Sequence, residues 1–106
     1  MVVLNNSVKA KSTGEGVERE ILASGGKLMT VKFTFQKGAI GPPHSHPHEQ
    51  VGYIIKGKFE FEMDGKKQIL NAGDSYYVKP DTRHGVKALE DAAILDVFTP
   101  QREDFL

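Results

Sequence analysis

The stretch GAIGPPHSHPHEQVGYIIKG, residues 38–57, decides how the chain folds. Histidines stand at alternate positions in its first half, and an apolar segment that ends at a glycine forms its second half. Alternate side chains of a strand lie on one face, so His44 and His46 would point the same way, with Gln50 at the same parity. Two imidazoles on one face can share a metal ion. The alternative is a polar loop with exposed histidines, which is favoured by the three prolines Pro42, Pro43 and Pro47.

The rest of the chain has the same short-strand character. Eleven glycines and five prolines divide its 106 residues into apolar segments of about four to eight residues, a pattern typical of an all-β sandwich or barrel. Asp64-Gly65 is a two-residue hairpin signal, because both central positions of the favoured turn need positive φ. Residues 5–16 are polar and predict a loose surface segment. We expect about eight strands, at Val17–Ala23, Val31–Phe35, Gln50–Lys56, Phe59–Met63, Lys66–Leu70, Ser75–Val78, His84–Ala88 and Ala92–Thr99.

Length and composition exclude several classes of function. A chain of 106 residues, 39% hydrophobic and 26% charged, predicts a single globular domain over residues 1–106. No apolar run approaches the roughly 20 residues that span a bilayer, so we expect no membrane partner. Fourteen Lys and Arg balance fourteen Asp and Glu, so no basic field attracts nucleic acid. The chain has no cysteine, so a metal would need His, carboxylate or amide ligands. The first residues lack the features of a secretory signal, and we expect a cytoplasmic protein.

Two segments match a known family motif by motif. In residues 38–57, Gly38, His44, His46, Gln50 and Gly57 have the spacing of the first cupin motif, with Gln50 at the usual Glu. Residues 73–88 resemble the second motif, with His84 in place, although Lys79, Asp81 and Ala88 stand at its usual Pro, Gly and Asn. The chain is therefore identified as a member of the cupin superfamily. The resemblance implies an antiparallel jelly-roll β-barrel, a homodimer, and one divalent metal ion held by His44, His46, Gln50 and His84.

These ligands bear on the chemistry of the implied metal. Because Gln50 is neutral, the ion would keep its full charge for substrate oxygens, which favours a Lewis-acid role. Imidazole and amide ligands suit zinc, nickel, iron, manganese or cobalt, and the ligand types leave this choice open. His48 follows Pro47, and we expect its side chain to point away from the site.

Asp96 is a carboxylate in the middle of an apolar strand, residues 92–99. An ionised carboxylate is costly there unless it is paired, hydrogen-bonded or facing a polar cavity. One interpretation is a buried structural salt bridge. The other is that Asp96 lies beside the metal, where burial could tune it as a proton carrier.

Residues 43–53 and 96–106 carry a second resemblance, to the small pectin-degradation cupins of the KdgF family. That family converts 4,5-unsaturated uronates, released by lyases from pectin or alginate, to the linear keto form. The resemblance implies functional roles for Asp96, Phe98 and Arg102. Arg102 could hold a substrate carboxylate through its bidentate fork, or it could be a solvated tail residue paired with Glu103 or Asp104. The three tyrosines, Tyr53, Tyr76 and Tyr77, are interpreted as barrel packing.

Three functions compete at this point. The leading hypothesis is a metal-dependent, redox-neutral enzyme that acts on a small uronate. A cupin dioxygenase using iron is the first alternative, since three histidines could support it. A non-catalytic cupin that binds a sugar or another small ligand is the second, and it would need no proton carrier at Asp96.

Overall fold

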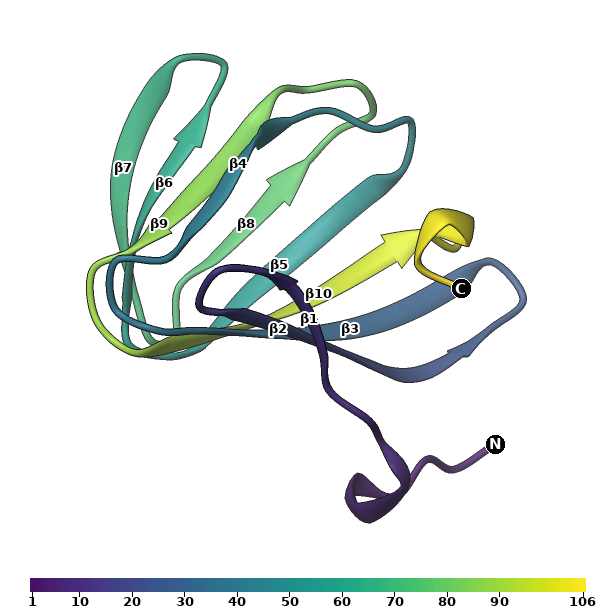
Figure 1. Ribbon diagram of the computed structural model, residues 1–106. Helices are drawn as coiled ribbons and strands as arrows, with labels where there is room; N and C mark the ends of the chain where they lie inside the picture. Colours follow the sequence, from purple (N-terminus) through teal and green to yellow (C-terminus); the bar gives the residue numbers. More distant parts are fainter.

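The computed structural model describes residues 1–106 as two facing antiparallel sheets, with a short 3-10 helix near each end of the chain (Figure 1). The six-stranded sheet has the order β1-β2-β3-β10-β5-β8, and the four-stranded sheet has the order β4-β9-β6-β7. Every strand pair is antiparallel. The elements are η1 (Asn5–Ser7), β1 (Lys11–Gly14), β2 (Val17–Gly25), β3 (Leu28–Phe35), β4 (Ile40–His44), β5 (Glu49–Lys56), β6 (Lys58–Met63), β7 (Lys66–Asn71), β8 (Ser75–Val78), β9 (His84–Ala88), β10 (Ala92–Thr99) and η2 (Glu103–Phe105).

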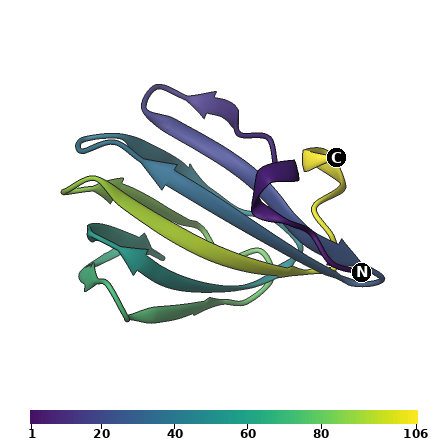
Figure 2. The ribbon, with the colours of Figure 1, turned by 90° about the horizontal axis from the view of Figure 1, so that it is seen from below.

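All eight expected strands are present, and the predicted all-β jelly-roll class is confirmed. The period of two is visible in the burial of β5, where Gln50, Gly52 and Ile54 face inward and their neighbours are exposed. The hairpin between β6 and β7 turns at Asp64 and Gly65, whose φ angles are 52° and 78°. Figure 2 shows the strands of the six-stranded sheet side by side. Neither helix is long and apolar enough to cross a membrane.

Two expectations about local structure were wrong. Residues 11–14 form a strand, β1, which pairs with β2 at the sheet edge; all four of its residues are exposed, so no apolar pattern marks it. His44, His46 and Gln50 do not share one strand, because the chain crosses from one sheet to the other between them. His44 ends β4, His46 lies in the connection and Gln50 is the second residue of β5.

The main core lies between the two sheets. Its buried side chains are Val17, Phe35, Ile54, Phe59, Phe61, Leu70, Val78, Ala88, Ala92 and Ile94. A second, smaller cluster of Met29, Val31 and Phe98 extends along β3 and β10 toward η2, where Phe105 packs against it. Removing this apolar surface from water is the main driving force for the fold, so polar groups on the inward faces stand out as exceptions.

Candidate metal centre

Three histidines from separate parts of the chain converge between the sheets. The last residue of β4, His44, lies directly opposite the first residue of β9, His84, in the strand register. His46 joins them from the connection between β4 and β5, and one ring nitrogen of each residue lies within 4.8 Å of the others. His46 and His84 are buried, whereas His44 is exposed. The structure therefore brings together the three histidines that the two motifs predict.

Backbone carbonyl groups fix the orientation of all three imidazoles. Nδ1 of His44 donates to the carbonyl of Pro42 at 3.0 Å, and Nδ1 of His84 donates to that of Thr82 at 2.8 Å. Nδ1 of His46 donates to the carbonyl of His48 at 3.1 Å. With the proton on Nδ1, the Nε2 lone pair of each ring is free to bind a metal, which is the usual outer-shell arrangement for metal-binding histidines. Nε2 of His84 is buried and has no hydrogen-bond partner, as expected of a metal ligand.

Gln50 completes a set of four donor groups. Its Nε2 donates to Oδ1 of Asp96 at 2.9 Å, so its Oε1 faces the histidines and lies 2.9 Å from Nε2 of His46. Both of these facing atoms carry lone pairs when the His46 proton is on Nδ1. Two acceptors so close together repel each other unless a cation lies between them. The residues present therefore fit a metal ion bound by three imidazoles and one amide oxygen.

Burial keeps the inner histidines in the form that binds metals. The pKa of His84 is lowered to about 4, mainly by burial and also by the charges of the neighbouring histidines and Arg102, against the raising effect of the hydrogen bond to Thr82. Burial also lowers the pKa of His46, helped by the charge of Arg102. Both rings are therefore neutral near pH 7, and metal binding does not have to displace a proton from either.

Asp96 lies in the middle of β10 and is 4% exposed. Its Oδ1 accepts hydrogen bonds from Nε2 of Gln50 at 2.9 Å and from the hydroxyl of Tyr76 at 2.8 Å. Burial raises its pKa to about 6, against the smaller lowering effects of these hydrogen bonds and of Arg102. The structure contains no ion pair at Asp96, so the interpretation as a buried salt bridge was wrong. A carboxyl group with a pKa of about 6 can both take up and release a proton near neutral pH.

Tyr76 reaches Asp96 because a glycine separates them. Gly52 of β5 lies opposite Tyr76 of β8 on one side and opposite Asp96 of β10 on the other. With no side chain at Gly52, the Tyr76 ring crosses β5 and its hydroxyl meets the carboxylate. Tyr76 also stacks on Phe61 at 4.4 Å between ring centroids, so its interpretation as packing was incomplete. The signal that could have revealed this contact is a glycine at an inward position of β5.

Phe98 and Arg102 lie beside the histidines. Phe98 is 2% exposed, and its ring meets that of His46 edge-on with 5.7 Å between centroids. Arg102 is 7% exposed and therefore not a solvated tail residue. Its Nε and Nη2 donate to the carboxylate of Asp104 at 3.1 and 2.9 Å, which confirms the expected pairing within the tail. That fork of Arg102 is thus already occupied by a carboxylate of the chain itself.

A cavity of about 220 Å³ connects these groups. It is below the usual size of drug-sized ligand sites, roughly 300–1,000 Å³, and fits one small molecule. His44, His84, Gln50, Asp96, Phe98 and Arg102 all line it, whereas His48 does not. Arg19 of β2 and Phe105 of η2 also line the cavity, and neither was predicted as a site residue. The sequence feature that could have identified Arg19 is a positively charged residue at the same strand parity as the apolar residues Val17 and Ile21.

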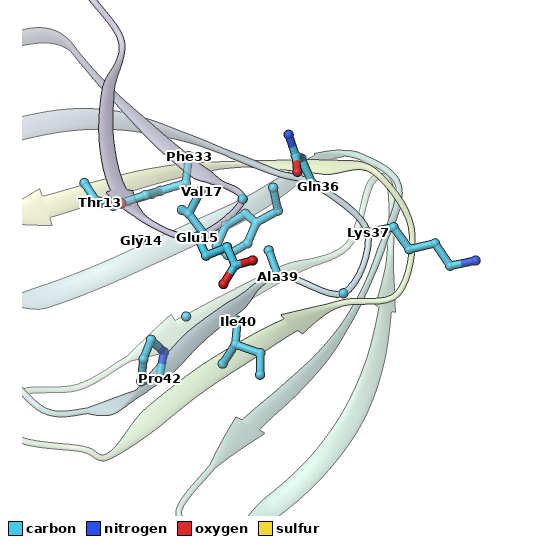
Figure 3. A pocket seen from close by; sticks show the side chains of 14 residues that line it. Thr13, Gly14, Glu15, Val17, Phe33, Gln36, Lys37, Ala39, Ile40 and Pro42 are labelled. Atoms are coloured by element: carbon cyan, nitrogen blue, oxygen red, sulfur yellow. The ribbon is translucent and has the colours of Figure 1, made fainter.

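A larger cavity of about 620 Å³ opens beside the first, between the β1–β2 turn and the segment from β3 to β4 (Figure 3). It contains no histidine, and Glu15 is its acidic lining residue, while Lys37 extends away from it. The two cavities share Thr13, Phe33, Phe35 and Gly41. The smaller cavity holds the groups capable of chemistry, and the larger one adjoins it through these shared residues.

Residues 31–98 match the family described as Cupin domain. The chain therefore belongs to the cupin family. Its two sheets face each other, and histidines from both motifs lie between them.

Within this family the chain is similar to KdgF proteins. It is 44% identical over 95 residues to the pectin degradation protein KdgF of Dickeya dadantii (strain 3937), covering 88% of this chain and 86% of that protein. The structure of KdgF from Halomonas sp. has a TM-score of 0.95 and 38% identity and covers 100% of this chain and 98% of that one. An RmlC-like cupin from Shewanella frigidimarina NCIMB 400 has a TM-score of 0.95 and 37% identity, covering 99% and 95%. The resemblance to the KdgF family is confirmed.

Proposed function

We propose that this protein is a metal-dependent, redox-neutral enzyme that converts 4,5-unsaturated uronates, released by pectin or alginate lyases, to their linear keto form. The observation that carries the proposal is the contact between Gln50 and Asp96, which joins a candidate ligand to a buried carboxyl group inside one small cavity. The similarity to KdgF over most of both chains supports the choice of substrate.

The conversion adds and removes no atoms, so it needs proton movement and no oxidant. A proton leaves the anomeric hydroxyl, the bond between C1 and the ring oxygen breaks, and a proton is added at C4 of the resulting enol. Asp96 serves as the proton carrier, since its pKa of about 6 suits both directions of transfer. Tyr76 and Gln50 hold its carboxylate in place.

The metal ligands in this proposal are His44, His46, Gln50 and His84. A divalent ion there would supply a Lewis acid that polarises a substrate oxygen. Phe98 provides an apolar wall for the sugar ring, and Arg102 provides positive charge close to the reacting groups. Zinc, nickel, iron, manganese and cobalt all suit the donor set, and metal analysis of the purified protein decides among them.

The decisive experiment supplies the metal-loaded protein with the unsaturated monouronate that an exhaustive lyase digest produces. Loss of the ultraviolet absorbance of the conjugated double bond, without oxygen uptake, supports the proposal. Oxygen consumption coupled to turnover would instead identify an iron dioxygenase. Saturable binding without any change in absorbance would identify a binding module. A sample treated with a chelator, and the same sample reloaded with metal, serve as controls.

The proposal includes a cytoplasmic homodimer of single-domain chains. The outward face of β5 and β8 exposes a row of large apolar side chains, Val51, Tyr53, Ile55 and Tyr77, each 43–51% exposed. Contiguous apolar patches of this kind on a sheet mark interaction surfaces. Light scattering after size-exclusion chromatography tests the dimer, and Tyr53→Lys should shift the protein toward the monomer if this face is the interface.

A further inference from the structure

Arg19 is a cation on the inward face of a strand that otherwise buries apolar residues. It lies on β2, between buried Val17 and half-buried Ile21 at the same parity, and opposite Phe33 of β3. Its side chain lines the cavity of the histidines and Asp96. A charged group at such a position needs a compensating partner, so the surroundings of the guanidinium decide what Arg19 does.

The C-terminal turn holds the guanidinium in position. The Cζ of Arg19 lies 4.2 Å from the ring centroid of Phe105, which is within the range of a cation–π contact. The same ring lies 4.2 Å from the Cζ of Arg102 and meets Phe33 and Phe98 edge-on at 6.2 and 5.9 Å. Phe105 therefore contacts both guanidinium groups that line the cavity wall.

The two arginines differ in what they have left to bind. Arg102 donates from Nε and Nη2 to the carboxylate of Asp104. Arg19 makes no side-chain hydrogen bond and no ion pair. Lys11 of β1 lies directly opposite Arg19 in the strand register and is also unpaired. Like charges opposite each other destabilise a strand pair, and an anionic ligand would remove this cost.

We propose that Arg19 is the substrate-binding residue that receives the carboxylate of a small organic acid, with its bidentate fork free for that purpose. This inference rests on the proposed function and names the group that recognises the acid end of the uronate. A guanidinium matches a carboxylate through two parallel hydrogen bonds, which a lysine cannot reproduce. Arg102, paired with Asp104, instead contributes positive charge near the histidines, whose pKa values it lowers.

The test compares Arg19→Gln and Arg19→Lys with Lys32→Gln. Lys32 lies on β3 at the opposite parity, so its replacement removes one positive charge from the outer face of the same sheet. We expect Arg19→Gln to raise KM for the unsaturated uronate about 10- to 100-fold, the range that charge-assisted hydrogen bonds carry, with kcat within a few-fold. Arg19→Lys should be intermediate, and Lys32→Gln unchanged. Metal content should be the same in all four proteins.

A binding measurement separates this inference from the proposed function and from a purely structural role. Calorimetry with galacturonate and with its methyl ester reports whether the protein recognises the negative charge. The wild type should prefer galacturonate by at least tenfold, and Arg19→Gln should lose that preference. A preference that survives in Arg19→Gln, or is missing in the wild type, overturns the inference. Equal weakening of both ligands would assign Arg19 to packing on Phe105. Failure of turnover alone, with the preference present in the wild type and lost in the variant, overturns only the proposed reaction.

Discussion

Replacing Gly52 by alanine should push Tyr76 away from Asp96. A Cβ built on Gly52 would lie 2.5 Å from Cε1 of Tyr76 and closer still to its Cζ and hydroxyl oxygen, whereas real Cβ contacts essentially never fall below 3.0 Å. The ring lies against Phe61 in a stacked contact, so it has little freedom to shift. The hydrogen bond from the Tyr76 hydroxyl to Oδ1 of Asp96 should therefore be lost.

Two effects set the size of the loss in stability. Overpacking of a well-packed interior typically costs about 1–3 kcal/mol, and a buried hydrogen bond to a charged group contributes about 1.5–3 kcal/mol. We expect Gly52→Ala to lose about 2–4 kcal/mol, on the order of 10 °C in Tm. Tyr76→Phe should lose only the hydrogen-bond part. Its pH–rate profile should move to higher pH, because the lost hydrogen bond lowers the pKa of Asp96 in the wild type.

Thermal unfolding followed by circular dichroism measures both variants. Gly25→Ala is the matched control, since a Cβ at Gly25 of β2 meets nothing within 4 Å. In a Tyr76→Ala background the overlap is gone, so adding Gly52→Ala should cost little. If Gly52→Ala were as stable as the wild type, or equally destabilising in both backgrounds, the proposed contact between these strands would be refuted.

Three further predictions concern the metal centre. His44→Ala and His84→Ala should each empty the site by elemental analysis, whereas His48→Ala, outside the histidine cluster, should retain the metal; full metal content in the first two would contradict the ligand set. Gln50→Glu should keep the metal but lower turnover, because a carboxylate reduces the ion's effective charge and cannot donate to Asp96; faster turnover would contradict this reasoning. Without metal, the free energy of unfolding of the Asp96→Asn variant, measured by urea unfolding, should increase as pH rises from about 4 toward 6.5. The reason is that His84 binds a proton in this pH range when the chain is unfolded but not when it is folded. In the wild type the slope should be flatter, since Asp96 changes its pKa from 3.8 to about 6 on folding and opposes it.

The strands could be predicted from the sequence because each carries its own local pattern. Val31, Phe33 and Phe35 alternate with polar residues, and Asp64-Gly65 fixes a hairpin, so neither needs knowledge of distant parts of the chain. β1 had no such pattern, because its four exposed residues are ordered only by pairing with β2. An edge strand without a buried face is determined by its neighbour.

The candidate site could be predicted in its residues but not in its construction. The motif spacing pointed to His44, His46, Gln50 and His84, yet the shared-strand explanation for the first three failed at the crossing between the two sheets. The partners of Asp96 and Arg102 depend on how β8, β10 and η2 pack, which no local pattern encodes. Arg19 needed the same long-range information, since its cavity is closed by the opposite end of the chain.

The departure of Gln50 from the usual cupin Glu follows from its neighbour Asp96. A glutamate at position 50 would place a second carboxylate against the buried oxygen that the Gln50 amide now donates to. Two carboxylates at that distance cannot both be ionised, so with the carboxylate at position 50 held ionised by the metal, Asp96 would keep its proton near neutral pH and would be lost as a proton carrier. The amide avoids this conflict, since its nitrogen satisfies Asp96 while its oxygen faces His46. Gln50 and Tyr76 both donate hydrogen bonds to the buried Oδ1 of Asp96, so this oxygen is satisfied without an ion pair. The carboxylate is therefore not neutralised by a cation of the chain and can accept a proton from the substrate.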